Sequence, residues 1–169
     1  MMEINDYWKL VEQARKSVDD PADIYDVAER LKEILKTMDL ERIKGAANAY
    51  KQLAQAAYSW QLWGAAYVIN GGCSDDGFDY FIGWLIGQGK KTYEQALADP
   101  DWLAKVEVEA DEAYGEDMLA AATQAYKELT GDYPKDLKVF PLPELGPSWD
   151  FDDDKEMCRR YPKLCEKFM

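Results

Sequence analysis

Three carboxylates and one thiol lie close together in the segment 73–79. Asp75, Asp76 and Asp79 could act as general acid and base, or could bind a divalent cation. Cys73 directly precedes a predicted helix start, where the helix dipole favours the thiolate form. A small enzyme that uses these groups on a small polar substrate is therefore one hypothesis for this chain.

The same residues also have a purely structural interpretation. Residues 70–72 would end one helix, because glycine readily adopts the left-handed conformation that closes a helix. Ser74 or Asp75 would cap the next helix, and the carboxylates would complement its positive first turn. A metal ion needs more oxygen ligands than this segment offers, and neighbouring carboxylates oppose ionisation of Cys73. We therefore predict no metal site and assign no catalytic residue.

Recognition of a ligand is the third interpretation, because many aromatic residues surround the acidic segment. Rings with a few convergent carboxylates commonly line small-ligand sites, and such a pocket suits a cationic ligand or a Lys or Arg side chain. The candidate ligand-binding residues are Trp60, Trp63, Tyr67, Asn70, Cys73, Asp75, Asp76, Asp79, Tyr80 and Trp84.

Several classes of function are not supported by the sequence. The chain has no histidine, which removes Ser-His and Cys-His nucleophile pairs. The segment 71–74 has neither the length nor the lysine of a phosphate-binding P-loop. No other cofactor motif is recognisable, and we expect no cofactor.

Charge and cysteine content bear on partners and location. The net charge of −13 disfavours nucleic acid and anionic membranes, and suits a basic protein partner. The longest apolar run is far too short to cross a bilayer. Three cysteines, an odd number, favour free thiols in the cytoplasm; Cys158 and Cys165 could pair only if Pro162 bends the chain between them. The oligomeric state is not indicated.

The hydrophobic periodicity is typical of an all-α protein. Apolar residues recur every three or four positions, and caps or glycines separate the stretches, which predicts a single compact bundle of about seven or eight helices. The expected helices are 5–18, 21–37, 39–58, 61–70, 75–87, 92–99, 100–106 and 116–131. The stretch 61–70 is apolar on nearly every side, which places it at the centre of the core.

Prolines and glycine interrupt the segment 132–150 and predict an extended C-terminal segment. Its expected anchors to the body are Phe140, Leu142, Leu145 and Trp149, and a short helix broken by Pro162 should follow. The predicted organisation is a helical domain over 1–131, with residues 132–169 packed on it.

The run from Trp60 to Gly89 resembles an uncharacterised, mainly bacterial family, the domain of unknown function 4240. The similarity includes Trp60-Gln61-Leu62-Trp63-Gly64, the loop from Asn70 to Tyr80 and Gly83-Trp84-Leu85-Ile86. It extends over about Ile4 to Gly131 and is weaker in the proline-rich tail. It implies a helical domain with this segment as its hallmark, and no activity, substrate or cofactor.

Two functional hypotheses follow. We favour a non-catalytic binding or regulatory domain that recognises a partner protein or small ligand around the loop 70–80, for example an immunity protein that neutralises a basic toxin. The alternative is the small enzyme based on Asp75, Asp76 or Asp79, with a metal ion or Cys73. The lack of a recognisable nucleophile and base favours the first hypothesis.

Overall fold

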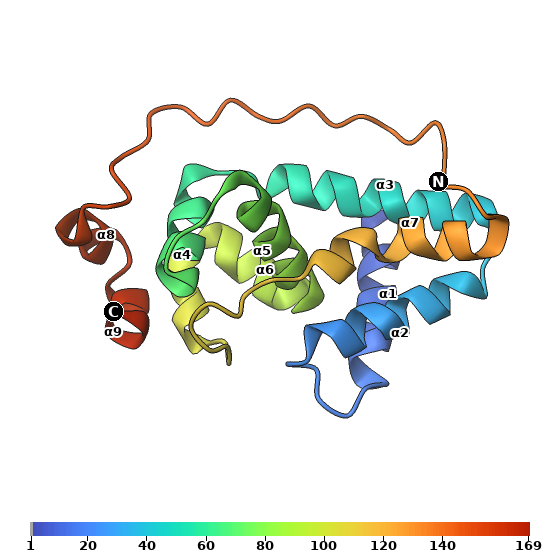
Figure 1. The fold of residues 1–169 in the computed structure, drawn as a ribbon, viewed down its shortest axis with the longest axis horizontal. Coiled ribbons are helices and arrows are strands. Elements are labelled where there is room, and N and C mark those ends of the chain that lie inside the picture. Colours follow the sequence, from blue (N-terminus) through green and yellow to red (C-terminus); the bar gives the residue numbers. More distant parts are fainter. Residues whose placement is uncertain (1) are drawn as a thin grey trace.

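The computed structural model of the protein describes residues 2–169, and it confirms the prediction of an all-α fold (Figure 1). This range contains nine α-helices and one 3-10 helix, η1, with no strand. The elements are α1 (Ile4–Lys16), α2 (Ile24–Lys36), α3 (Leu40–Ala56), α4 (Trp60–Asn70), α5 (Asp75–Gly87), α6 (Lys90–Ala98), η1 (Pro100–Lys105), α7 (Glu116–Thr130), α8 (Asp154–Arg160) and α9 (Pro162–Phe168). None of the helices within residues 2–169 has the length and apolar composition of a membrane span.

Side-chain caps explain where several helices begin. Asp39 accepts a hydrogen bond from the backbone N–H of Arg42 at the start of α3, and Ser59 accepts one from Leu62 at the start of α4. The predicted start of the second helix at Pro21 is wrong, because Asp23 supplies the cap and α2 begins at Ile24. The additional helices relative to the expected number come from the C-terminus.

Helices α4 and α5 contribute many buried side chains to the core. The large apolar side chains of α5 are completely or almost completely buried, and they include Phe78, Phe81, Ile82, Leu85 and Ile86. In α4, Leu62, Val68 and Ile69 are buried as well. Helix α7 packs against α2, α3 and α5, so it closes the bundle on the side away from α4 (Figure 1).

Two glycines let α5 and the start of α7 approach each other at backbone distance. A Cβ atom added to Gly83 would lie 2.2 Å from the carbonyl oxygen of Gly115, and one added to Gly115 would lie 2.3 Å from the backbone nitrogen of Trp84. The N–H of Gly115 donates a 2.7 Å hydrogen bond to the carbonyl of Tyr80. This contact places the beginning of α7 beside the middle of α5.

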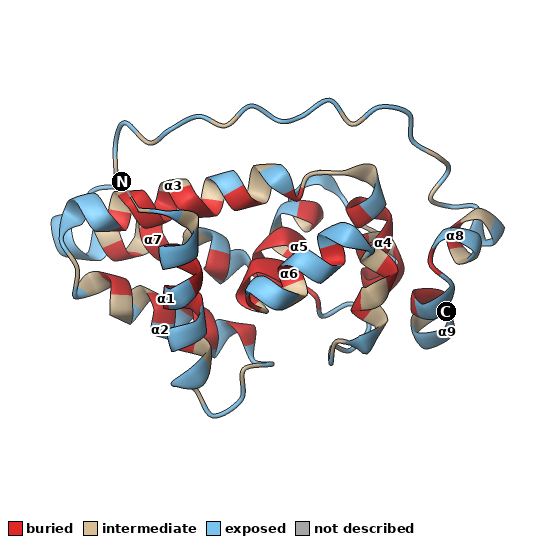
Figure 2. Cartoon of the chain, turned by 180° about the vertical axis from the view of Figure 1, so that it is seen from behind, coloured by how far each residue is buried: buried red, intermediate tan, exposed pale blue. Residues whose placement is uncertain are grey.

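Residues 132–150, which we call the strap, contain no helix and run along the α3 side of the molecule from α7 toward α8 (Figure 1). Most of the strap is exposed (Figure 2). Leu137, Trp149 and the following Phe151 pack against the core. The predicted anchor Leu142 is instead 64% exposed, because an extended chain on a surface can turn only part of its side chains inward.

Helices α8 and α9 form a C-terminal hairpin, which packs on α4 and η1. The chain bends at Tyr161, directly before Pro162, as the proline suggested. This bend brings Cys158 and Cys165 together in a disulfide with a Cα–Cα distance of 5.5 Å. The prediction of three free thiols is therefore wrong: in the described part of the chain Cys73 is the free cysteine.

Candidate functional site

The loop between α4 and α5 has the geometry of a helix stop followed by a helix start. Gly71 adopts a left-handed conformation with φ 69°, and its N–H bonds to the carbonyl of Tyr67. The Ser74 hydroxyl then accepts a 3.1 Å hydrogen bond from the N–H of Gly77. Of the two predicted caps, Ser74 is the one that caps α5.

The three carboxylates of the loop are all exposed but differ in what they face. Asp75 and Asp76 lie in the first turn of α5, and among the described residues neither side chain accepts a capping hydrogen bond. Partial burial, and then the negative charges of Asp76 and Asp75, raise the pKa of Asp79. Within residues 2–169 no three acidic or cysteine side chains are arranged to hold a metal ion.

The Cys73 thiol lacks the properties of a reactive nucleophile. The residue is half-buried, and its burial together with the charges of Asp75 and Asp79 raises the pKa of the thiol to about 12. These effects oppose the helix dipole, which would favour the thiolate. At neutral pH the thiol is therefore protonated.

Three predicted site residues have structural contacts inside the protein. They are Trp63, Trp84 and Tyr80. The Trp63 ring stacks on Phe78 with centroids 4.6 Å apart, and its indole N–H donates a 2.9 Å hydrogen bond to the carbonyl of Cys73. Trp84 is 2% exposed. Tyr80 is half-buried, and its carbonyl binds the N–H of Gly115.

Asn70 connects the end of α4 to the loop before α7. Its buried amide donates from Nδ2 to the carbonyl of Ala113 at 3.2 Å and accepts from the N–H of Ala113 at 3.0 Å. The side-chain amide of Asn70 therefore satisfies both the N–H and the carbonyl of the Ala113 backbone. Both polar ends of Asn70 are used inside the protein.

Trp60 and Tyr67 face the chain's own C-terminal segment. The Phe151 ring lies edge-on to both, with centroids 6.1 Å from Trp60 and 5.5 Å from Tyr67. The Tyr67 hydroxyl also donates a short hydrogen bond to the carboxylate of Asp152. The acidic group that meets these two aromatic side chains is therefore Asp152 of the C-terminal segment, and not one of the predicted carboxylates of the loop 70–80.

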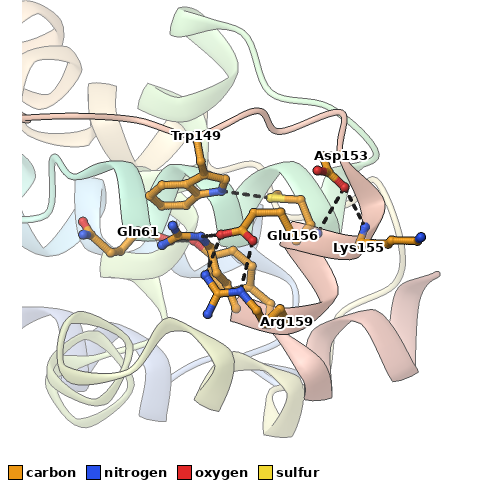
Figure 3. Close-up of polar contacts among 9 residues, drawn as sticks. Gln61, Trp149, Asp153, Lys155, Glu156 and Arg159 are labelled. Atoms are coloured by element: carbon orange, nitrogen blue, oxygen red, sulfur yellow. Dashed lines mark hydrogen bonds and ion pairs between the residues drawn. The ribbon is translucent and has the colours of Figure 1, made fainter.

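Charged and aromatic side chains make contacts within the C-terminal segment, and Tyr161 joins this segment to α4 (Figure 3). The Arg160 guanidinium lies 3.7 Å above the centre of the Trp149 ring, a cation–π contact. Glu156 accepts hydrogen bonds from both Arg159 and Arg160, which lower its pKa to about 2. The Tyr161 hydroxyl donates to the carbonyl of Gln61 at 2.5 Å.

A groove of about 470 Å³ opens on another face, between α3, α5, α7 and the strap. We call it the α3–α5–α7 groove. Its lining is mainly apolar and aromatic, and it includes two charged residues, Lys51 on α3 and Asp79 on α5. The lining residues are Tyr50, Lys51, Ala54, Gln55, Tyr58, Asp79, Ile82, Leu119, Thr123, Leu137, Phe140 and Leu142. Its volume lies within the range of small-ligand sites. Asp79 is the predicted site residue that lines it.

No local pattern in the sequence predicted this groove. Its walls come from positions 50–58, 79–82, 119–123 and the strap, which no local pattern connects. The available signal was the α3 face, where small and large residues alternate at Ala47, Tyr50 and Ala54. Tyr50 is buried, and among the described residues its hydroxyl has no hydrogen-bond partner.

The structure is that of an all-α domain with a predominantly apolar groove, whose lining includes the acidic Asp79 and the basic Lys51. The chain belongs to the family described as "Protein of unknown function (DUF4240)", whose sequence model matches residues 2–128. No curated protein and no solved structure gives a significant match to the chain. The match ends within α7, so the strap and the C-terminal hairpin lie outside it.

Proposed function

We propose that the chain is a non-catalytic binding domain and that the α3–α5–α7 groove is its recognition surface. The ligand combines an apolar body with a positively charged group, either in a small amine or in a Lys or Arg side chain of a partner. The groove supports the apolar part of this proposal, because rings and aliphatic side chains from three helices line it.

The observation that carries the proposal is the position of Asp79. Its carboxylate lies at the groove wall, and its charged form is disfavoured by partial burial and by the charges of Asp76 and Asp75. A ligand cation at this point would stabilise the carboxylate and lower its pKa again. The net charge of −13 would also attract cationic ligands over a longer range.

The enzyme hypothesis receives less support from the same geometry. Its nucleophile would be Cys73, a thiol that burial and two carboxylates keep protonated. Asp75 and Asp76 face solvent, away from the groove.

A cytoplasmic location remains part of the proposal. The free Cys73 thiol is compatible with it, whereas the Cys158–Cys165 disulfide is more typical of an oxidising compartment.

Thermal shift measurements with matched amine and carboxylate compounds test this function. Phenethylamine should raise the melting temperature of the wild type more than phenylpropionate does, because Asp79 attracts the amine and repels the anion, although Lys51 on the α3 side of the groove attracts the anion. The shift should disappear in Asp79→Asn and persist in Asp75→Asn, a control in the same helix outside the groove. It should also weaken as the pH falls and Asp79 becomes protonated, and this should happen at a higher pH than for an ordinary aspartate, because the pKa of Asp79 is raised. Equal shifts with both compounds, or no shift at all, would refute the proposal.

A further inference from the structure

Three side chains of the region that the family model matches, which we call the family domain, form hydrogen bonds with the main chain of the strap. Asn48 Oδ1 accepts a 2.8 Å hydrogen bond from the N–H of Lys138. The side-chain amide of Gln55 donates to the carbonyl of Pro141 at 2.5 Å, and the indole N–H of Trp60 donates to the carbonyl of Gly146 at 3.0 Å. These three side chains, which we call the Asn48–Gln55–Trp60 row, therefore contact the strap through groups that every peptide has.

The spacing of this row matches an extended chain. Asn48 and Gln55 are seven positions apart in α3, a rise of about 10 Å. Lys138 and Pro141 are three positions apart in extended chain, which also covers about 10 Å. The strap thus runs parallel to α3 with its polar groups in register with the helix surface. This agreement makes the row a receptor for an extended backbone.

The chemistry of the row also tolerates proline. Two of its three contacts use donors aimed at carbonyl groups, and proline keeps its carbonyl although it lacks an N–H. The strap carries prolines at 134, 141, 143 and 147, and these fix φ near the extended conformation before binding. A preformed extended segment loses less conformational freedom when it docks.

The strap nevertheless fills the neighbouring groove poorly. Val139 is 85% exposed and Leu142 is 64% exposed, although both are large apolar side chains. A space of about 470 Å³ remains between the strap and the helices. The strap residues that line the groove, Leu137, Phe140 and Leu142, place no positive charge near Asp79.

We propose that the helical walls of the α3–α5–α7 groove and the Asn48–Gln55–Trp60 row form a docking site for an extended, proline-containing segment of a partner protein, with a basic residue opposite Asp79. The strap occupies this site within the same chain and is displaced by the partner. The row and the helical walls lie in the region matched by the family, and the strap lies outside it. This inference rests on the proposed function and names its partner.

Occupation by the strap sets the affinity that a partner experiences. A tethered segment has an effective concentration in the millimolar range, so it competes strongly even when each contact is weak. A free peptide should therefore bind more weakly to the intact chain than to a chain whose strap has lost its contacts. The affinity difference measures how well the strap occupies the site.

Fluorescence anisotropy with a labelled peptide of residues 137–147 tests this inference. The receptor is the full chain in which residues 137–146 are replaced by a Gly/Ser segment of equal length, so that the hairpin stays attached. The peptide should bind this chain at least about tenfold more tightly than the wild type. Leu142→Arg in the peptide should strengthen binding further, because Leu142 and Asp79 line the same groove; no gain would overturn the basic residue opposite Asp79.

Variants of the row supply the specificity control. In the strap-replaced chain, the double change Asn48→Ala and Gln55→Ala should weaken peptide binding about tenfold, the loss expected for two hydrogen bonds. Gln52→Ala, an exposed change on α3 outside the row, should leave it unchanged. Should the strap-replaced chain not fold, Leu137→Ser with Phe140→Ser in the wild-type strap provides a second displaced form.

Three outcomes would overturn the inference. The first is the absence of peptide binding to a strap-replaced chain whose circular dichroism and melting match the wild type. The second is equal binding to the wild type, which would place the peptide elsewhere. The third is a dimer of the strap-replaced chain that the peptide does not dissociate, which would assign the groove to a second copy. Continued stabilisation by phenethylamine through Asp79 would show that the proposed function survives and only the peptide inference fails.

Discussion

The Asp101 carboxylate accepts a 2.9 Å hydrogen bond from the backbone N–H of Leu164, at the start of the last helix. Its second oxygen accepts a 3.1 Å bond from the N–H of Lys163. Asp101 lies on η1 and is only 6% exposed, so its charge is balanced by the free N–H groups and the dipole of α9. One side chain of the family domain thereby caps a helix of the C-terminal hairpin.

Replacement of Asp101 by alanine should detach the hairpin before it affects the bundle. Loss of the cap should reduce the free energy that holds α9 by about 1–2 kcal/mol. Hydrogen exchange of the amides of Lys163 and Leu164 should accelerate accordingly, while amides of α5 remain protected. Asp19→Asn, a change at an exposed aspartate without a partner in the described part of the chain, is the control. Unchanged exchange in α9 would contradict this role.

The role of Asp101 shows what the sequence could and could not predict. The helices, the buried faces of α4 and α5 and the stop at Gly71 follow from periodicity and capping, which are local in the sequence. Asp101 instead acts on residues more than sixty positions away, so no local pattern indicates it. The same limit applies to the groove, and to the tail that covers Trp60 and Tyr67.

Gly83 should tolerate a side chain much less than Gly77, although both lie in α5. Gly83→Ala would push a methyl group into the backbone of Gly115, and we expect a loss of about 3 kcal/mol or more in the free energy of unfolding. At Gly77 the nearest atom to an added Cβ is the Ser74 hydroxyl oxygen at 3.2 Å, so alanine should change stability by less than about 1 kcal/mol. Urea denaturation of both variants measures the difference, and equal losses would show that the backbone contact relaxes freely.

Alkylation of the folded protein should distinguish the three cysteines. Cys73 should react slowly at pH 8, because a pKa of about 12 leaves roughly one thiol in ten thousand ionised, against about a tenth or more for an ordinary thiol. Cys158 and Cys165 should react only after reduction. Mass spectrometry of peptides after timed iodoacetamide treatment reads all three sites. Rapid labelling of Cys73, or of the pair without a reductant, would contradict the geometry.

The raised pKa of the Cys73 thiol also predicts how stability depends on pH. The folded state keeps the thiol protonated up to a higher pH than the unfolded state does. Its contribution to stability is therefore complete below the pKa of an unfolded cysteine, about 8.5, and is lost as the pH rises toward 12. Cys73→Ala should remove part of the decline in stability between pH 8.5 and 10.5. A decline identical to that of the wild type would mean that other groups cause it.

Tyr50 and Tyr93 form a matched pair for the last prediction, because both are buried and only one hydroxyl is bonded. The Tyr93 hydroxyl donates a 2.6 Å hydrogen bond to the carbonyl of Leu53, so Tyr93→Phe should cost about 1–2 kcal/mol. Among the described residues the Tyr50 hydroxyl has no partner, and Tyr50→Phe removes a buried polar group that gains nothing in the free protein. Its stability should equal or exceed that of the wild type.

The same variant then reports on the groove. The Tyr50 hydroxyl is buried, so a ligand beside Asp79 does not contact its oxygen, and Tyr50→Phe should leave phenethylamine binding unchanged. Urea denaturation and calorimetric titration of the two phenylalanine variants measure both quantities. A Tyr50→Phe protein as destabilised as Tyr93→Phe would show that the Tyr50 hydroxyl is satisfied by an internal water. Weaker phenethylamine binding without a loss of stability would show that the groove opens as far as the hydroxyl.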